Sequence, residues 1–191
     1  DHVRRAIEIV GPTDSLVGNV ITLMTLQQKY DQAMGYTARM LAEHPDLHVI
    51  REQYISQLVN QQRIDEAFAV AEDGLRHDAD NVSNIARLGQ LEANFRDINR
   101  AVELLRRGVE LEPDNVTARV LLSQALVRFG DLDASEVQIS AAMELVPDDA
   151  KPAVIMDYCR ALYSFGHNQR GDQWQQRAQD IVNTLQPPAT E

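Results

Sequence analysis

The feature that most constrains this chain is a period of 34 residues that recurs along it. Four positions mark the period: Pro45, Ala79, Pro113 and Pro147. A small residue stands twelve positions before each mark, in the series Ala33, Ala67, Ala101 and Ser135. A fixed period of about 20 to 50 residues is typical of repeat arrays, in which each unit buries its apolar face only against its neighbours. The period therefore predicts one continuous array.

The pattern within each period is helical. Apolar residues recur at spacings of three and four, as in Val102, Leu105 and Val109. Each period breaks twice, once at the mark and once near pairs such as Gly130-Asp131. Glycine suits the end of a helix that needs positive φ, and Asp or Asn side chains accept hydrogen bonds from the free amides that open a helix. The residues expected to open the first helices are Asp46, Asp80-Asn81, Asp114-Asn115 and Asp148-Asp149. Each period is thus predicted to form two short helices joined by a turn.

The residues of the third full period carry a family resemblance. Its first helix contains Leu88-Gly89, its second helix contains Ala101, and it closes with Pro113. A 34-residue helical pair with these residues resembles the tetratricopeptide repeat. The resemblance extends from about Arg4 to Val182. It implies an all-α fold, a right-handed α-solenoid of antiparallel helix pairs, in which the first helices line a concave surface.

The chain also departs from the family pattern. The family's usual Trp in the first helix is replaced by Arg51, Ile85 and Arg119, and Glu92 stands where an aromatic residue is preferred. In the last unit, Phe165-Gly166 follows Phe129-Gly130 by 36 residues instead of 34. We therefore expect two inserted residues near Ala150-Lys151-Pro152.

The register defines the expected boundaries of a single solenoid over residues 1–185. Four full repeats are predicted at residues 14–47, 48–81, 82–115 and 116–149, followed by a shifted repeat at residues 150–185. Residues 1–13 align with the second helix of a repeat whose first helix is not in the sequence, which predicts a piece of a longer array. Residues 186–191 are expected to form a tail after the last, glutamine-rich helix.

Composition restricts the classes of partner. The chain has 18 Lys and Arg against 29 Asp and Glu, a net charge of −11. The acidic excess is spread evenly, and nucleic-acid binding would need a clustered basic face. No apolar run approaches the length of a membrane span, about 18 residues or more. We therefore predict no nucleic-acid partner and no membrane insertion. The expected protein is soluble, of the cytoplasm or the periplasm, and the sequence does not distinguish these compartments.

The residues suited to chemistry are few. Cys159 is the only cysteine, which excludes an internal disulfide and a zinc-thiolate cluster. It corresponds in register to Gly89 and Ser123, so we expect a small buried thiol. His44 and His48 straddle Pro45 and so would not share one helix face. No phosphate loop, nucleophile elbow or His-Glu-x-x-His motif occurs in the sequence. We predict no enzyme, no cofactor and no metal.

Function is then expected in the concave groove of the solenoid. One row of groove-facing residues is Asn60, Asn94 and Arg128; a second is Ser56, Gln90, Gln124 and Arg160; a third is Glu52, Ala86, Val120 and Met156. An expected apolar patch comprises Val120, Val127, Met156 and Tyr163. Asn side chains can pair with the backbone of an extended peptide, and Arg side chains can meet a carboxylate. The alternative is that these residues form only solvated helix faces.

Two functions follow from this pattern. The first is a protein-interaction scaffold that binds a peptide, a helix or a partner subunit in its groove. The alternative is a regulatory or targeting segment of a larger enzyme or of a bacterial envelope or secretion machine. Self-association is a third prediction, because Val3, Ile7 and Val10 would be apolar residues without a covering first helix.

Overall fold

The structure is a computed structural model that describes residues 9 and 11–185. The truncated repeat expected at residues 1–13 lies mostly outside the described residues, as do the apolar residues Val3, Ile7 and Val10 and the tail at residues 186–191. The predictions that concern these segments stay predictions.

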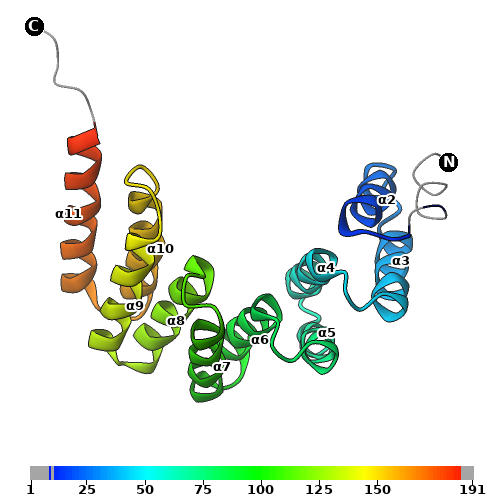
Figure 1. Ribbon diagram of the computed structural model, residues 1–191, viewed down its shortest axis with the longest axis horizontal. Coiled ribbons are helices and arrows are strands. Elements are labelled where there is room, and N and C mark those ends of the chain that lie inside the picture. Colours follow the sequence, from blue (N-terminus) through cyan, green and yellow to red (C-terminus); the bar gives the residue numbers. More distant parts are fainter. Residues whose placement is uncertain (1–8, 10, 186–191) are drawn as a thin grey trace, which may run out of the picture. The chain divides into compact units, whose positions relative to one another are not determined.

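The described residues form ten α-helices and no strand. The helices are α2 (Asp14–Leu26), α3 (Tyr30–Glu43), α4 (His48–Asn60), α5 (Ile64–His77), α6 (Val82–Phe95), α7 (Ile98–Leu111), α8 (Val116–Phe129), α9 (Leu132–Glu144), α10 (Lys151–Ser164) and α11 (Asn168–Leu185) (Figure 1). They follow one another in pairs, which fits about four to five helical repeats. The predicted all-α repeat fold is confirmed, whereas the division into particular repeats stays a prediction.

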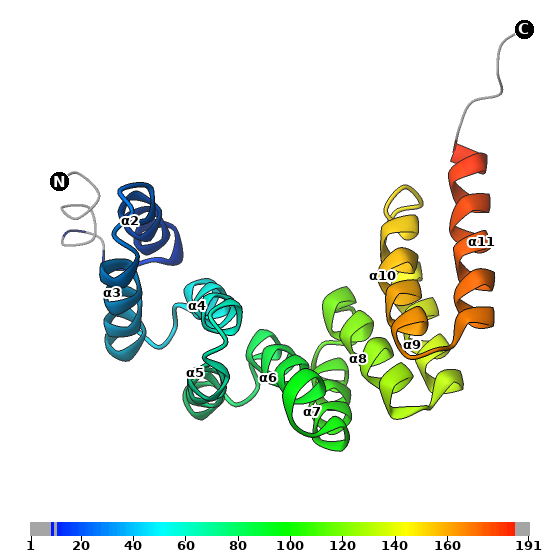
Figure 2. The same cartoon turned by 180° about the vertical axis from the view of Figure 1, so that it is seen from behind.

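The chain divides into two compact units, Asp1–Arg87 and Leu88–Glu191, and the boundary lies inside α6. In the first unit, α4 packs against α2, α3 and α5. In the second unit, α8 packs against α7, α9 and α10, and α10 also packs against α9 and α11. Figures 1 and 2 show α10 and α11 side by side from both directions. The connection at residues 145–150, before α10, is two residues longer than the connection at residues 112–115, before α8.

Small residues lie where the two helices of a pair meet. Ala67, Ala101 and Ser135 are fully buried. A Cβ added to Gly89 of α6 would lie 2.7 Å from Cγ of Leu105 on α7, closer than real side chains approach. Helices that pack this tightly have axes about 8–10 Å apart. The small residues of the period thus fix the distance between paired helices.

A polar side chain also crosses this seam in the α8–α9 and α10–α11 pairs, from the second helix in one pair and from the first helix in the other. Ser135 Oγ donates to the carbonyl oxygen of Ser123 at 3.1 Å, between α9 and α8. Cys159 Sγ donates to the carbonyl oxygen of Gly171 at 3.6 Å, between α10 and α11. In both pairs a small polar side chain satisfies a backbone carbonyl of the partner helix, so the contact adds direction to the close packing.

The opening of α4 differs from the prediction that Asp46 would cap it. Leu47 is the N-terminal cap residue, and no side chain of its own segment accepts a hydrogen bond there. Instead Asp14 of α2 accepts a hydrogen bond from the amide of Ile50, at 2.9 Å. At α8 the expected cap is present, because Asn115 accepts from the amide of Ala118 at 2.9 Å. A free amide can be satisfied from a neighbouring repeat as well as locally.

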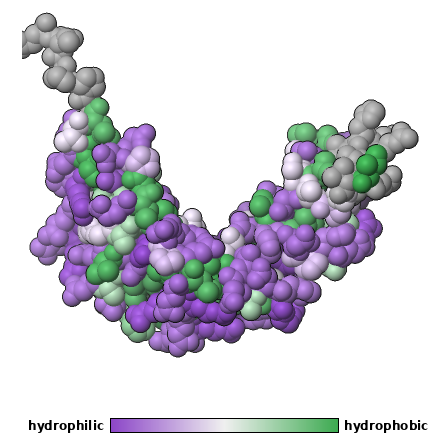
Figure 3. Space-filling view, viewed as in Figure 1, coloured by the Kyte–Doolittle hydropathy of each residue, from purple (hydrophilic) through white to green (hydrophobic). Residues whose placement is uncertain are grey.

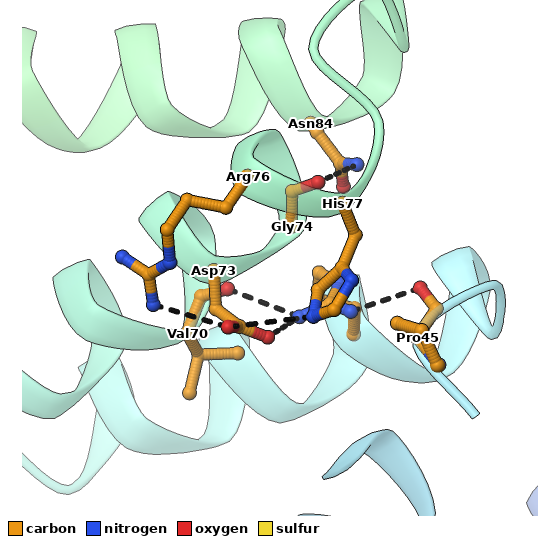
Figure 4. A network of polar contacts seen from close by, with 8 residues as sticks. Pro45, Val70, Asp73, Gly74, Arg76, His77 and Asn84 are labelled. Atoms are coloured by element: carbon orange, nitrogen blue, oxygen red, sulfur yellow. Dashed lines mark hydrogen bonds and ion pairs between the residues drawn. The ribbon is translucent and has the colours of Figure 1, made fainter. Parts of the chain in front are cut away.

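Arg51 occupies the position where the repeat family usually has Trp, and it is 1% exposed. Its guanidinium donates to the carbonyl oxygens of Val70, at 3.2 Å, and Pro45, at 2.9 Å. It also pairs with Asp73 at 3.2 Å. Figure 4 shows these partners converging from α5 and from the loop before α4. The buried charge is therefore matched by a carboxylate and two carbonyls, as a buried guanidinium requires.

Arg119, two periods later, makes a reduced version of the same contact. Its Nε donates to the carbonyl oxygen of Pro113 at 2.7 Å, and its Nη1 donates to Oε1 of Gln138 at 2.9 Å. In both cases an arginine six residues after a closing proline donates to the carbonyl oxygen of that proline. The same arginine also donates to the second helix of the repeat in which the arginine lies. Arg119 is half-buried and has no carboxylate partner in this contact.

Replacing Arg51 with Ala should destabilise the first unit. The change leaves a cavity and removes the donors of the Pro45 and Val70 carbonyls, which predicts a loss of about 2–4 kcal/mol in the free energy of unfolding. Arg119→Ala, the matched control, should cost about 1 kcal/mol because its site is more exposed. Urea unfolding followed by circular dichroism measures both. An equal or larger loss in Arg119→Ala would contradict this assignment.

Candidate peptide-binding groove

A pocket of about 470 Å³ lies on the second unit, which we call the unit 2 groove. First helices of the pairs supply most of its lining, through the C-terminal half of α6 and through α8 and α10. Its polar lining residues are Gln90, Asn94, Gln124, Arg128, Asp157, Arg160 and Ser164. Small and apolar residues, among them Ala93 and Ala125, lie between them. In Figure 3 hydrophilic residues cover most of the visible surface, with hydrophobic residues in patches among them.

Two periodicities bring the predicted residues together. Gln90 and Asn94 are four residues apart on α6, as are Gln124 and Arg128 on α8, so each pair shares one helix face. The 34-residue period then places the same face of α6 and α8 toward one pocket. Arg160 of α10 joins them with the two-residue shift. Five of the predicted residues therefore line one pocket of the second unit.

The groove carries an excess of positive charge. Its charged lining residues are Arg128, Arg160 and Asp157, in a chain whose net charge is −11. Arg160 pairs with Asp157 at 2.9 Å, and Arg160 is 76% exposed. The guanidinium carbon of Arg128 lies 5.8 Å from the ring centroid of Phe165, within the range of a cation–π contact. Both arginines can thus meet a ligand while remaining oriented by a neighbour.

Phe165 and Asp157 line the groove and were not among the predicted site residues. Phe165 is 45% exposed, and Phe95 and Phe129 stand at equivalent positions in the preceding repeats, 46% and 49% exposed. A search of the sequence for large apolar residues at the repeat period would have found this series. It offers apolar contact at the ends of α6, α8 and α10.

Four predicted residues belong to the first unit and do not line the unit 2 groove. One of them, Ala86 of α6, is 6% exposed and therefore does not face a groove at all. Glu52, Ser56 and Asn60 lie on α4. Arg87 donates to the carbonyl oxygen of Glu52 at 2.8 Å and also to the hydroxyl of Ser56. Burial lowers the pKa of Arg87, although the Glu52 carboxylate opposes that effect. Glu52 and Ser56 therefore help to hold this arginine within the first unit, and Asn60 is exposed at the end of α4.

The predicted apolar patch does not form as a unit. Val127 is 1% exposed and packs in the core with Ile139 and Met143, so it does not line the groove. One residue along a helix turns the side chain by about 100°, which takes Val127 inward while Arg128 stays outside. Val120 is half-buried against the same core. Met156 is 45% exposed but is not part of the groove lining.

Tyr163 faces α11 instead of the groove. Its hydroxyl lies 2.9 Å from Oδ1 of Asp172 and 2.8 Å from Oε1 of Gln175, and it can donate to either. Gly171 makes room for the ring, because an added Cβ would lie 2.6 Å from Cε1 of Tyr163. Tyr163 therefore contacts α11 and does not line the unit 2 groove.

Comparison with known proteins supports the fold. Residues 95–153 match the family model for the tetratricopeptide repeat. The chain has the tetratricopeptide repeat fold. No curated protein sequence matches it significantly. Among its described residues, no helix combines the length and apolar character needed to cross a bilayer.

Solved tetratricopeptide repeat structures superpose along most of the chain. YrrB, described as a TPR protein with an unusual peptide-binding site, has a TM-score of 0.62 and 19% identity, covering 97% of this chain and 94% of its own. MamA has a TM-score of 0.64 at 12% identity, covering 86% and 95%. A thermophilic TPR protein from Thermus thermophilus has a TM-score of 0.65 at 12% identity, covering 90% and 93%. Likeness at these identities establishes the fold alone.

Cys159 is buried, 1% exposed, in the core between α10 and α11. Burial raises the pKa of its thiol above the ordinary value. A higher pKa lowers the thiolate fraction at pH 8, and the thiolate is the reactive form. We expect the native protein to react with a thiol reagent at pH 8 far more slowly than the urea-unfolded protein does, measured by absorbance. Equal rates in the two states would contradict the burial of Cys159.

Proposed function

We propose that the chain is a protein-interaction scaffold that binds an extended segment of a partner protein in the unit 2 groove. The observation that supports this most strongly is the convergence of Gln90, Asn94, Gln124, Arg128 and Arg160 on one pocket. They come from three first helices, yet they recur at the period of the repeat. The volume of about 470 Å³ is within the usual range of ligand pockets, about 300–1,000 Å³.

The amide side chains suit a peptide backbone. Gln90, Asn94 and Gln124 each present both a donor and an acceptor, which is what an extended backbone requires of a partner. Gln124 Nε2 lies 3.5 Å from the carbonyl oxygen of Asp157, at the limit of a hydrogen bond. Exchanging that long contact for a shorter one to a peptide carbonyl would favour binding.

The arginines suit a carboxylate on the same peptide. Arg128 is exposed beside Phe165, so a ligand with a carboxylate next to an apolar side chain would contact both groups. Asp157 neutralises one of the two arginines, which leaves the groove with a single excess positive charge. The proposed ligand is accordingly an extended peptide with one acidic residue near an apolar one. YrrB, with its peptide-binding site, offers a precedent within this fold.

The test uses a peptide selected from a random library against the wild-type chain. Isothermal titration calorimetry then compares its affinity for the wild type and for Asn94→Ala/Arg128→Ala. Loss of a charge-assisted hydrogen bond and an amide contact should weaken binding by at least about tenfold. Arg106→Ala is the matched control, because Arg106 is an exposed arginine of α7 outside the groove lining. It should leave the affinity unchanged.

Two results would contradict the proposal. The first is an unchanged affinity in the groove variant while its circular dichroism spectrum matches the wild type. The second is an equal loss in Arg106→Ala, which would indicate a general charge effect instead of a site.

A further inference from the structure

A second pocket of about 470 Å³ lies within the first unit, and we call it the α3–α5 pocket. Its walls come from the second helices of two pairs and are made of small or aliphatic residues: Ala38, Leu41 and Ala42 of α3 and Ala69 and Val70 of α5. Arg51 and Tyr54 of α4 also line it, and Asp73, Arg76 and His77 of α5 form its rim. The unit 2 groove, by contrast, is lined mainly by first helices.

The rim of this pocket gathers three basic side chains around one carboxylate. Asp73 pairs with Arg51 at 3.2 Å, with Arg76 at 3.0 Å and with His77, through Nε2, at 3.7 Å. Figure 4 shows Asp73, Arg76 and His77 close together on α5. Arg76 is 66% exposed and His77 is 51% exposed, while Arg51 is buried. The lining therefore has two permanent positive charges against one negative charge, in a chain of net charge −11.

The chain contains a matched pocket without this rim. A smaller pocket of about 230 Å³ includes Arg106, Val109 and Gln138, which lie two periods after Ala38, Leu41 and Val70. At the register of Arg76 and His77, two periods later, the chain has Glu144 and Leu145. A pocket at this position is thus a recurring feature, whereas its basic rim belongs to the first unit.

We propose that the α3–α5 pocket binds an acidic peptide, with the carboxylate of a Glu or Asp side chain on Arg76 and His77 and an aliphatic neighbour against the alanines. Charge complementarity identifies this occupant, because the pocket joins an apolar wall to an excess of basic groups. A guanidinium has five donor hydrogens, and the hydrogen bond from Arg76 to Asp73 involves only one of its nitrogens, Nη2. Asp73 holds the basic groups in place for a second carboxylate. This site is independent of the unit 2 groove.

The experiment titrates the full 191-residue chain, labelled with ¹⁵N, with two defined peptides. The probe is acetyl-Gly-Leu-Glu-Leu-Gly-amide, and the control peptide has Gln in place of Glu. The Glu peptide should produce saturable amide shifts in α3 and α5, and the Gln peptide should bind at least about fivefold more weakly. Arg76→Gln should weaken binding of the Glu peptide at least about tenfold. Arg106→Gln, which removes the same charge beside the matched pocket, should not.

Four outcomes would overturn the proposal. They are equal affinity for the Glu and Gln peptides, unchanged binding in Arg76→Gln, amide shifts confined to α6, α8 and α10, and sodium acetate producing the same shifts at the same concentration. The last two would assign the peptide to the unit 2 groove and the pocket to small carboxylates, respectively. Because Arg76 is largely exposed, its replacement leaves the fold intact, and circular dichroism verifies this.

Discussion

The close approach of paired helices at small residues is the constraint on which the rest of this structure depends. A repeat array has no single central core, so each helix must bury its apolar face against its immediate neighbours. Three small residues are fully buried at these seams: Ala67, Ala101 and Ser135. At Gly89 the side chain of Leu105 leaves no room for a Cβ. With the separation of the helices set in this way, equivalent residues of successive repeats face the same direction. The unit 2 groove is a direct consequence.

The features that depend only on the helical and repeat periods could be predicted from the sequence. Gln90, Asn94, Gln124 and Arg128 were placed on one surface because helix spacing and repeat spacing agree, and they line one pocket. Periodicity does not distinguish the edge of the buried stripe from the surface beside it. Val127 for this reason packs into the core, although it is adjacent to Arg128 in the sequence.

Contacts between a side chain and a particular residue of another helix or loop could not be predicted from the sequence. Arg51 in place of the family's Trp is a departure from the sequence pattern, but its carbonyl and carboxylate partners come from α5 and from the loop before α4. Asp14 of α2 accepts a hydrogen bond from the amide of Ile50 in the first turn of α4. Rules for local capping do not predict this contact, because Asp14 lies on another helix. Tyr163 turns toward α11 because Gly171 leaves room for its ring. In each case a residue outside the helix concerned decides the outcome.

Net charge also conceals local charge. The acidic excess of the whole chain is compatible with two pockets whose linings are slightly basic, one in each unit and formed by different sets of helices. The proposed function requires that the unit 2 groove binds a peptide. The most direct test is a ¹⁵N spectrum of the side-chain amides with and without the selected peptide. We expect shifts for the side-chain amides of Asn94 and Gln124 and none for Asn99, whose side-chain amide donates to Asp97 at the start of α7. Shifts at Asn99 with Asn94 and Gln124 unmoved would contradict it.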